Sequence, residues 1–214
     1  FTFHSSRAPM KNVSAPELAA MNGHMERCAR ELSDARMDIV ASACLVAIMS
    51  QGLGYHRKTQ AELEGVCHLE APDTQVITSA GALVDSLKAI GAKRVSFITP
   101  YMKGLTELVA GYIENEGIKV KDTISLEIPN NLDVGAQDPK NLIEIVKRLD
   151  TSKVDAVVLS ACVQMPSLSA LAEVQKSFDV PVLSTAAATV FQILKALKLP
   201  TVVPDAGELL SGKY

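Results

Sequence analysis

The stretch VLSACVQMPS, residues 158–167, decides how this sequence folds, because the chain contains a close copy of it. Residues 40–49 are VASACLVAIM, so an apolar run ends twice in Ser-Ala-Cys. In each copy the apolar, partly β-branched residues predict a buried strand, and the cysteine follows where that strand gives way to a loop. Cys44 and Cys162 therefore occupy the same position in two related units.

Short apolar runs alternate with longer segments of helical periodicity along the chain. Strands are predicted at residues 38–43, 75–78, 94–99, 118–127, 155–160 and 180–183. Helices are predicted at residues 15–32, 59–66, 80–90, 105–116, 139–149, 167–178 and 186–197. Strands that are apolar on both faces and alternate with helices are typical of α/β proteins with parallel sheets. Gly91 and Gly117 each follow a predicted helix, where a left-handed cap leads into the next strand.

The repeat extends beyond the cysteines. Residues 78–89, TSAGALVDSLKA, match residues 185–196, TAAATVFQILKA, with the initial threonine and the final Leu-Lys-Ala in register. Two copies of strand, cysteine loop, helix, strand, threonine and helix predict two similar Rossmann-like halves with parallel sheets. We expect a pseudo-twofold axis to relate them across a cleft. Residues 1–97 with 186–214 are expected to form the first half, and residues 98–185 the second.

Composition excludes several classes of partner. The chain has 214 residues, 48% of them hydrophobic, which supports a substantial core. Its net charge is -3, with acidic and basic residues interspersed and no basic block of the kind that binds nucleic acid. No apolar run approaches the ~20 residues of a membrane helix, and the start FTFHSSRAPM lacks the features of a signal peptide. We expect a soluble, cytoplasmic protein that binds neither nucleic acid nor membrane.

The four cysteines are scattered, with no CxxC or Cys/His pair at metal-ligand spacing, so free thiols are predicted and no metal site. Cys28 and Cys67 have no counterpart and are interpreted as core residues. Cys44 and Cys162 fall at the carboxyl ends of strands, where parallel sheets bind ligands and helix N-termini offer N–H groups. Such surroundings lower a thiol pKa. Two thiols on opposite sides of a small carboxylate can act as base and acid, or as nucleophile and proton donor.

Three other features are ambiguous from sequence alone. Tyr101 follows a strand and could reach the cleft or pack as an ordinary loop residue. Asn131 lies in a turn-rich segment where asparagine commonly caps or turns the chain. The segment SQGLGYHRKT, residues 50–59, forms either a solvated loop or a hinged lid that carries His56 and Arg57 over an anionic ligand. Cys162 is expected to lead promptly into a helix, and Cys44 into this longer glycine-bearing loop.

At this point the sequence resembles a known group of enzymes. The paired cysteine loops of a duplicated α/β chain resemble the aspartate/glutamate racemase superfamily. The stretches VLSACVQMPSL, TSAGALVDSLKAIGAKRV, TPYMK and SLEIPNNLDVGA are similar to those of its maleate cis-trans isomerase family. Racemases of the superfamily typically have threonine after each cysteine, whereas Leu45 and Val163 follow here; decarboxylases typically keep only the second cysteine.

The resemblance implies a role for each site residue. Cys44 would be the nucleophile and Cys162 the proton donor and acceptor, with no cofactor and no metal. Tyr101 and Asn131 would contact the carboxylates of a small dicarboxylate substrate, maleate. The residues after each cysteine would contribute mainly backbone N–H groups; these are Leu45, Val46, Val163 and Gln164. Relatives begin with a further strand whose loop carries a substrate-binding asparagine, so such a segment is expected before Phe1, with FTFHSS as the second strand.

The implied activity is conversion of maleate to fumarate in bacterial nicotinate breakdown, through a covalent succinyl-cysteine intermediate and in a homodimer. A racemase or decarboxylase acting on a related dicarboxylate is the enzymatic alternative. A small-acid binding domain without catalysis is the alternative from another class, and it leaves the repeated cysteines unexplained.

Overall fold

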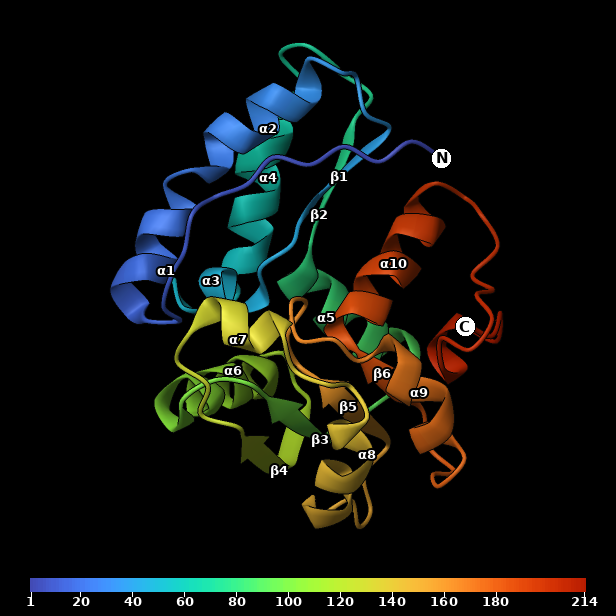
Figure 1. Cartoon of the computed structure of the whole chain (residues 1–214). Coiled ribbons are helices and arrows are strands. Elements are labelled where there is room, and N and C mark those ends of the chain that lie inside the picture. The colour runs from blue at the N-terminus through green and yellow to red at the C-terminus, as the bar shows by residue number, and fades with distance from the viewer.

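A computed structural model describes all 214 residues, Phe1–Tyr214, and contains two separate parallel sheets (Figure 1). The smaller sheet pairs β1 (Ile39–Ser42) with β2 (Gln75–Thr78). The larger sheet has the strand order β4-β3-β5-β6, and every neighbouring pair is parallel. The α/β class with parallel sheets is therefore confirmed.

The strands of the larger sheet are β3 (Arg94–Thr99), β4 (Lys119–Ser125), β5 (Ala156–Ser160) and β6 (Val182–Ser184). All six strands predicted from apolar runs are thus present, with ends shifted by up to two residues. The strand expected at FTFHSS is not: residues 1–10 contain no strand. Phe1 and Phe3 are 89% and 92% exposed. No neighbouring strand pairs with this segment, so its backbone lacks the partner that a strand requires.

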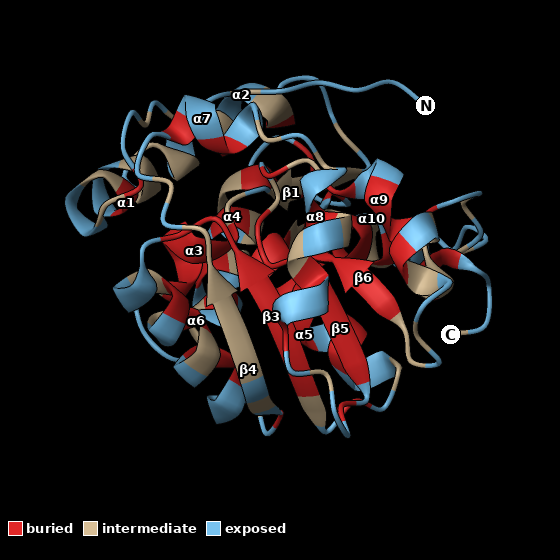
Figure 2. Cartoon of the chain, turned by 60° about the horizontal axis from the view of Figure 1, so that its bottom comes forward, coloured by how far each residue is buried: buried red, intermediate tan, exposed pale blue.

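The four-stranded sheet forms the centre of the core. β5 and β6 are buried throughout and β3 almost so, whereas the edge strand β4 stays half-exposed (Figure 2). These strands belong to one cluster of 43 buried residues that continues into α3 (Leu45–Met49) and α5 (Ser79–Ala89). Burial on both faces explains why the strands are continuous apolar runs with little alternation.

The helices agree with the sequence pattern except at four places. The segment 15–32 is two helices, α1 (Ala15–Asn22) and α2 (Met25–Ser33), broken at Gly23, a poor helix former. The short helices α3 and α7 (Asn131–Gly135) were not expected. Residues 141–148 form α8 (Asn141–Ile145) and a 3₁₀ turn (Val146–Arg148). The remaining helices lie close to their predicted positions, although α4 begins at Tyr55 and not at residue 59: α4 (Tyr55–Cys67), α5, α6 (Lys103–Asn115), α9 (Leu168–Gln175) and α10 (Thr185–Ala196).

Two glycines end helices as the sequence indicates. Gly91 and Gly117 have φ values of +77° and +84°, a left-handed conformation that residues with a Cβ rarely adopt. Each follows a helix and precedes a strand, so the predicted left-handed caps are confirmed. None of the ten α-helices is long and apolar enough to cross a membrane.

Helix α10 lies against the part of the chain that contains β1 and β2 (Figure 1). The Gln192 side chain donates to the Ser86 hydroxyl on α5 at 3.2 Å, and Gln75 at the start of β2 donates to the Ala196 carbonyl at 3.2 Å. After β6 the chain therefore returns to contact α5 and β2. β3, which belongs to the larger sheet, runs through the expected boundary at residue 97. The domain boundaries stay predictions.

The helices after β2 and β6 begin with equivalent side-chain caps. The Thr78 hydroxyl accepts the Gly81 N–H at 3.0 Å, and the Ser184 hydroxyl accepts the Ala187 N–H at 3.2 Å. Thr185, matched to Thr78 in the sequence repeat, is instead the first residue of α10. It is fully buried, and its hydroxyl has no hydrogen-bond partner. The two repeats are therefore offset by one residue at their helix starts, although both helices end at the matched alanines, Ala89 and Ala196.

This cap assignment predicts opposite effects of two neighbouring substitutions. Ser184→Ala removes the cap and should lower the free energy of unfolding by about 1 kcal/mol. Thr185→Val replaces a buried, unpaired hydroxyl with a methyl group and should leave stability unchanged or higher. Urea unfolding of both variants measures the difference. A loss in Thr185→Val as large as that in Ser184→Ala would contradict the assignment.

Candidate active site

Cys44 occupies the N-cap position of α3, directly after β1, with extended backbone angles of φ −140° and ψ 98°. The backbone N–H groups of Ala47 and Val46 face its sulfur and lower the thiol pKa, although no regular cap hydrogen bond closes. Two contacts fix this loop. The Ser79 hydroxyl donates to the Ser42 carbonyl at 3.1 Å, and the Asn22 amide donates to the Ala47 carbonyl at 2.7 Å. Cys44 is thus presented at the start of a buried helix.

Cys162 lies in the loop between β5 and α9. The buried Ser160 hydroxyl faces two carbonyls of this loop, those of Cys162 at 3.0 Å and Met165 at 3.5 Å. The loop therefore curls around Ser160, and the N–H groups of Met165 and Gln164 face the Cys162 sulfur. The expected contrast between the two cysteines is reversed. Cys44 leads directly into a helix, because its apolar run continues into the core as buried α3, whereas Cys162 is followed by a loop before α9 begins.

The two cysteine loops offer donors at the same offsets. In each loop the N–H groups of the second and third residues after the cysteine face the sulfur. Val46 and Gln164 were expected to contribute backbone N–H groups, whereas Ala47 and Met165 were missed. Leu45 and Val163 do not act on the sulfurs, and their contact with a substrate stays a prediction. The sequence repeat could have indicated these donors if each cysteine had been interpreted as a helix N-cap. The side chain of an N-cap residue faces the backbone N–H groups of the second and third helical residues.

Tyr101 follows β3 and is only 2% exposed. Its hydroxyl faces the Cys162 sulfur and, by donating to it, lowers the pKa of that thiol; burial raises the pKa of Tyr101 itself. The Thr99 hydroxyl is 2.6 Å from that of Thr106 and accepts the Tyr101 N–H at 3.3 Å, which fixes the turn. The carboxyl ends of β1, β3 and β5 thus bring Cys44, Tyr101 and Cys162 together.

Burial, however, dominates the acidity of both thiols. It raises the pKa of Cys44 to about 11, because the N–H groups of Ala47 and Val46 offset only part of the desolvation. Burial likewise raises the pKa of Cys162 despite its donors. The expectation that strand-end surroundings lower these pKa values is therefore wrong for the unliganded chain: the lowering groups are present, but loss of water outweighs them.

The two thiols also influence each other. A thiolate on Cys162 raises the pKa of Cys44, so the pair takes up a single negative charge before a second. Three donors face Cys162, namely the Tyr101 hydroxyl and two N–H groups, whereas two N–H groups face Cys44. These donors therefore favour Cys162 for the first charge.

Asn131 is 9% exposed and lies at the first position of α7. The capping role that its surroundings suggested belongs to Asn130, whose side chain accepts the N–H groups of residues 132 and 133. The Asn131 amide donates to the Met10 carbonyl at 3.3 Å, and the Gln164 side chain donates to the Asn131 carbonyl. α7 is thus tied to the Cys162 loop. Contact of Asn131 with a substrate stays a prediction.

The segment proposed as a lid is held at its second end. α4 begins at Tyr55, His56 is 4% exposed, and Arg57 binds both carboxylate oxygens of Glu116 at 2.8 and 2.6 Å. Glu116 follows the C-terminus of α6. This helix of 13 residues is about 20 Å long, and its N-terminus lies just after Tyr101. Arg57 is therefore held far from Tyr101, which disfavours the alternative in which this segment carries a cation over an anionic ligand.

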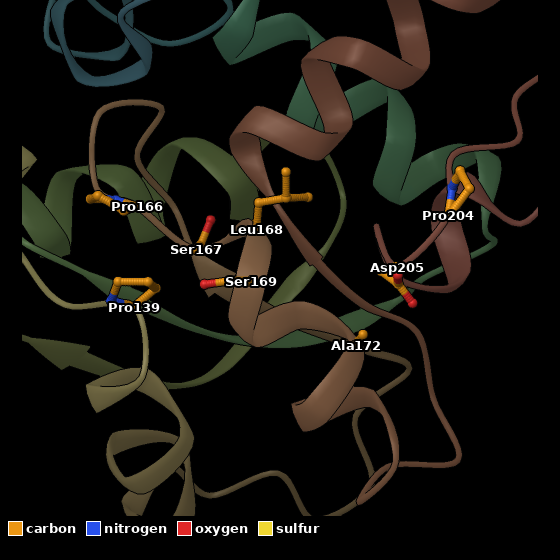
Figure 3. A pocket seen from close by; sticks show the side chains of 8 residues that line it. All are labelled: Pro139, Pro166, Ser167, Leu168, Ser169, Ala172, Pro204 and Asp205. Carbon is orange, nitrogen blue, oxygen red and sulfur yellow. The ribbon is translucent and has the colours of Figure 1, made fainter.

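A separate hollow of about 440 Å³ lies beside the start of α9 (Figure 3). Its residues are Pro139, Pro166, Ser167, Leu168, Ser169, Ala172, Pro204 and Asp205. Neither cysteine lines it, and its single charged group is the carboxylate of Asp205, which would repel a dicarboxylate. No group of three or more His, Cys, Asp or Glu residues is placed to hold a metal ion.

Comparison with known proteins identifies relatives of the chain. The family model described as arylmalonate decarboxylase matches residues 2–210. A maleate isomerase of Geobacillus stearothermophilus is 58% identical over 100% of this chain and 85% of its own. The crystal structure of a maleate isomerase variant from Pseudomonas putida S16 with maleate has a TM-score of 0.98 at 56% identity, covering 100% of this chain and 86% of that one.

A further structure bears on the chemistry. It is a cysteine-to-serine mutant of the Nocardia farcinica maleate cis-trans isomerase with a covalently bound succinylcysteine intermediate. Its TM-score is 0.96 at 41% identity, and the match covers 100% of this chain and 87% of that one. The fold and paired thiols thus define a cysteine-dependent α/β enzyme. The chain belongs to the arylmalonate decarboxylase family and, within it, to the maleate isomerases.

The contact of the Tyr101 hydroxyl with the Cys162 sulfur predicts that loss of this hydroxyl slows the alkylation of Cys162 alone. Tyr101→Phe removes a donor to the Cys162 thiolate, which should raise the pKa of this thiol further and slow its alkylation by iodoacetamide at pH 8 about tenfold. Peptide mass spectrometry across a pH series resolves the two cysteines, so Cys44, whose alkylation should not slow, is the internal control. An unchanged rate at Cys162 would show that Tyr101 does not stabilise its thiolate.

Proposed function

We propose that this enzyme converts maleate to fumarate without a cofactor, through a covalent bond to Cys44 and proton transfer by Cys162. The observation that carries the proposal is the convergence of two thiols, one partly buried and one buried, with Tyr101, at the carboxyl ends of three strands. Membership of the maleate isomerases supports the substrate. The succinylcysteine intermediate of the Nocardia farcinica relative supports a covalent route.

The first half of the reaction turns the double bond into a single bond. The Cys44 thiolate adds to one alkene carbon, and the displaced π electrons move toward the carboxylate beside the other carbon. The Cys162 thiol then protonates that second carbon. The product is a succinyl thioether on Cys44 with a thiolate on Cys162, so one negative charge stays on the pair. Rotation about the new single bond is easy, whereas rotation about the original double bond is not.

The second half reverses these steps from the rotated intermediate. The Cys162 thiolate removes the proton that it gave, the double bond re-forms, and the C–S bond breaks to release fumarate and the Cys44 thiolate. Atoms, protons and charge balance without an external acid, base or oxidant. The scheme needs one thiolate and one thiol, which is the state that mutual repulsion between the two sulfurs favours.

The reaction requires the thiolate charge to lie on Cys44, the sulfur that attacks maleate. In the unliganded chain the donors favour the first thiolate on Cys162, so we propose that Cys162 takes the Cys44 proton as maleate binds. The Tyr101 hydroxyl, released from Cys162 when that sulfur becomes neutral, can then donate to a substrate carboxylate. Asn131 and the N–H groups of the cysteine loops complete carboxylate binding in this proposal.

Two alternatives make different predictions. A racemase or decarboxylase acting on a related dicarboxylate would exchange an α-proton of aspartate with solvent or release carbon dioxide from a malonate. The family model's name, arylmalonate decarboxylase, favours the latter. A non-catalytic binding domain would hold maleate without turnover. Incubation with each substrate separates these activities.

The cellular setting rests on the family resemblance. We propose that the enzyme is cytoplasmic, works as a homodimer, and serves nicotinate breakdown, where maleate is the molecule to be isomerised. We also propose that the two halves, residues 1–97 with 186–214 and residues 98–185, form the two walls of the site. The positions of Cys44 and Cys162 in different sheets support this division.

Removal of either thiol should abolish turnover. Cys44→Ala prevents C–S bond formation and Cys162→Ala prevents proton transfer, so each should lower kcat for fumarate formation at least about a thousandfold. Cys28→Ala changes a partly exposed thiol on α2 and is the matched control. Fumarate formation is followed by proton NMR. Near wild-type turnover in either active-site variant would rule out the two-thiol mechanism.

The covalent step assigns the roles of the two sulfurs. Cys162→Ser incubated with maleate should accumulate a succinyl adduct, because the serine hydroxyl is too weak a base to drive elimination. Peptide mass spectrometry should place the adduct on Cys44. The opposite result would be an adduct on Cys162 in the reciprocal variant Cys44→Ser and no adduct on Cys44 in Cys162→Ser. It would mean that Cys162 is the nucleophile and Cys44 the proton donor.

A further inference from the structure

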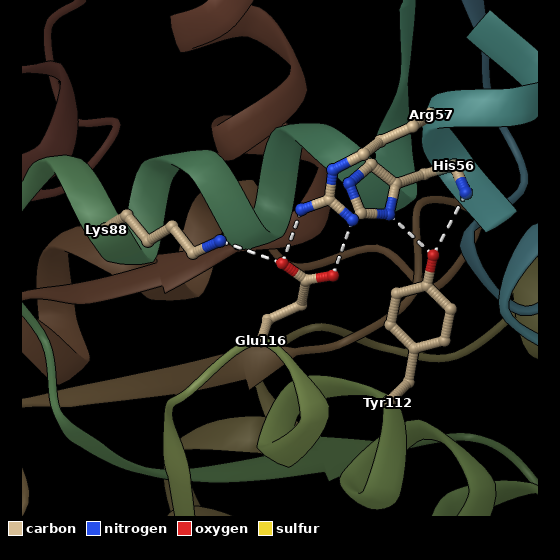
Figure 4. Close-up of polar contacts among 5 residues, drawn as sticks. All are labelled: His56, Arg57, Lys88, Tyr112 and Glu116. Carbon is tan, nitrogen blue, oxygen red and sulfur yellow. Dashed lines mark hydrogen bonds and ion pairs between the residues drawn. The ribbon is translucent and has the colours of Figure 1, made fainter. Parts of the chain in front are cut away.

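A buried polar contact joins α4 to α6 away from the cysteines (Figure 4). The Tyr112 hydroxyl accepts the His56 backbone N–H at 3.0 Å and lies 2.5 Å from the His56 Nδ1. Because the oxygen already accepts the backbone proton, its own proton is directed to Nδ1. His56 then acts as an acceptor at Nδ1 and carries its ring proton on Nε2. Burial, with Arg57, lowers the pKa of His56 and so favours this neutral ring.

The contact completes the start of α4. Gly54 is at the N-cap position, adopts φ +70° and has no side chain that could cap the helix. Backbone carbonyls accept two of the first N–H groups: that of Tyr55 binds Gly52, and that of Arg57 binds Gly54. His56 is the second residue of α4, and Tyr112 supplies the missing acceptor from another helix. The His56 N–H, near the start of the helix that follows α3 after a short turn, is thus satisfied only when α6 is in place.

An ionic contact lies one turn further along. Glu116 binds Arg57 at 2.8 and 2.6 Å and Lys88 of α5 at 2.8 Å (Figure 4). Its side chain is 5% exposed, and Arg57 first, then Lys88, hold the pKa of its carboxyl at about 2 despite burial. Tyr112 and Glu116 are four residues apart, so they lie on the same face of α6. We call His56, Arg57, Lys88, Tyr112 and Glu116 the α4–α6 clamp.

The clamp is connected by contacts to both cysteine loops. A Cβ added to Gly81 would lie 3.1 Å from the His56 ring, so the imidazole packs directly on the start of α5. In the same turn of α5, Ser79 donates to the Ser42 carbonyl, two residues before Cys44. At its other end, α6 begins just after Tyr101, which faces Cys162. Helix α6 therefore joins the clamp to the part of the site that contains Tyr101 and Cys162.

We infer that His56 and Tyr112, supported by Glu116, are positioning residues that hold the Cys44 loop against the loops of Tyr101 and Cys162. This inference rests on the proposed function for its kinetic consequence. Two sulfurs that act on adjacent carbons must keep a fixed separation, and a displacement of about 1 Å can cost on the order of a hundredfold in rate. The clamp connects the elements that set this separation without touching substrate.

Tyr112→Phe tests the inference because it removes only the hydroxyl oxygen that contacts His56. It leaves the His56 N–H and Nδ1 unpaired, so kcat for maleate should fall about tenfold to a hundredfold while KM changes less than about threefold. Tyr55→Phe, in the first turn of α4, is the matched control, because its hydroxyl makes no hydrogen bond within the chain. The assay is run well below the unfolding temperature of every variant.

Conservative replacement separates positioning from simple packing. His56→Asn keeps an acceptor near the Nδ1 position and should retain more of kcat than His56→Leu, which offers none. Cysteine alkylation by iodoacetamide gives a readout that does not need maleate. In Tyr112→Phe, Cys44 should react severalfold faster as its loop loosens, while Cys67, fully buried at the far end of α4, stays protected.

These readouts keep the inference and the proposed function distinct. Absence of fumarate formation by the wild-type enzyme would overturn the function, and faster alkylation of Cys44 alone in Tyr112→Phe would still support the clamp. Wild-type kcat together with unchanged Cys44 alkylation in folded Tyr112→Phe would overturn the clamp. Equal acceleration at Cys44 and Cys67 would also overturn it, because the tyrosine would then support only global stability.

Discussion

Two neighbouring thiols largely withdrawn from water, Cys162 buried and Cys44 partly buried, are the constraint around which this site is built. Burial favours the neutral thiol and raises the pKa of Cys44 and of Cys162, yet the proposed chemistry needs one of them ionised. Donors at strand ends supply the opposing effect, and repulsion between the sulfurs limits the pair to one charge. The desolvated thiolate that results is reactive because few hydrogen bonds must be broken when it attacks.

The fold meets this constraint with backbone groups. Parallel strands end at a common edge, and the turns after β1 and β5 direct N–H groups at the sulfurs while the side chains of Leu45 and Val46 remain in the core. An apolar sequence is therefore compatible with a polar site. Tyr101, which follows β3 beside β5, adds the one side-chain donor and makes the two thiols unequal.

The same arrangement makes the site depend on how its two parts are held together. Cys44 follows the small sheet and Cys162 the large one, so no strand pairing fixes their separation. Helices make much of the contact between the parts, because α6 packs against α3 and links the Tyr101 turn to α4. The segment before α1 adds a further contact, in which the Asn131 amide donates to the Met10 carbonyl. Buried partners such as His56 and Tyr112 suit this task because an unpaired polar group in the core is costly, so the contact is strongly preferred over a loosened one.

The sequence by itself determined the strand and helix alternation, the glycine caps at Gly91 and Gly117, and the pair of strand-end cysteines. These depend on local periodicity and on a repeat that can be read directly. Only the tertiary structure decided the buried helix α3, whose apolar run has no helical period, and the cap at Ser184. It also decided the direction of the thiol pKa values and the partnership of His56 with Tyr112. Desolvation and contacts between distant residues exist only once the chain is packed, so no local pattern encodes them.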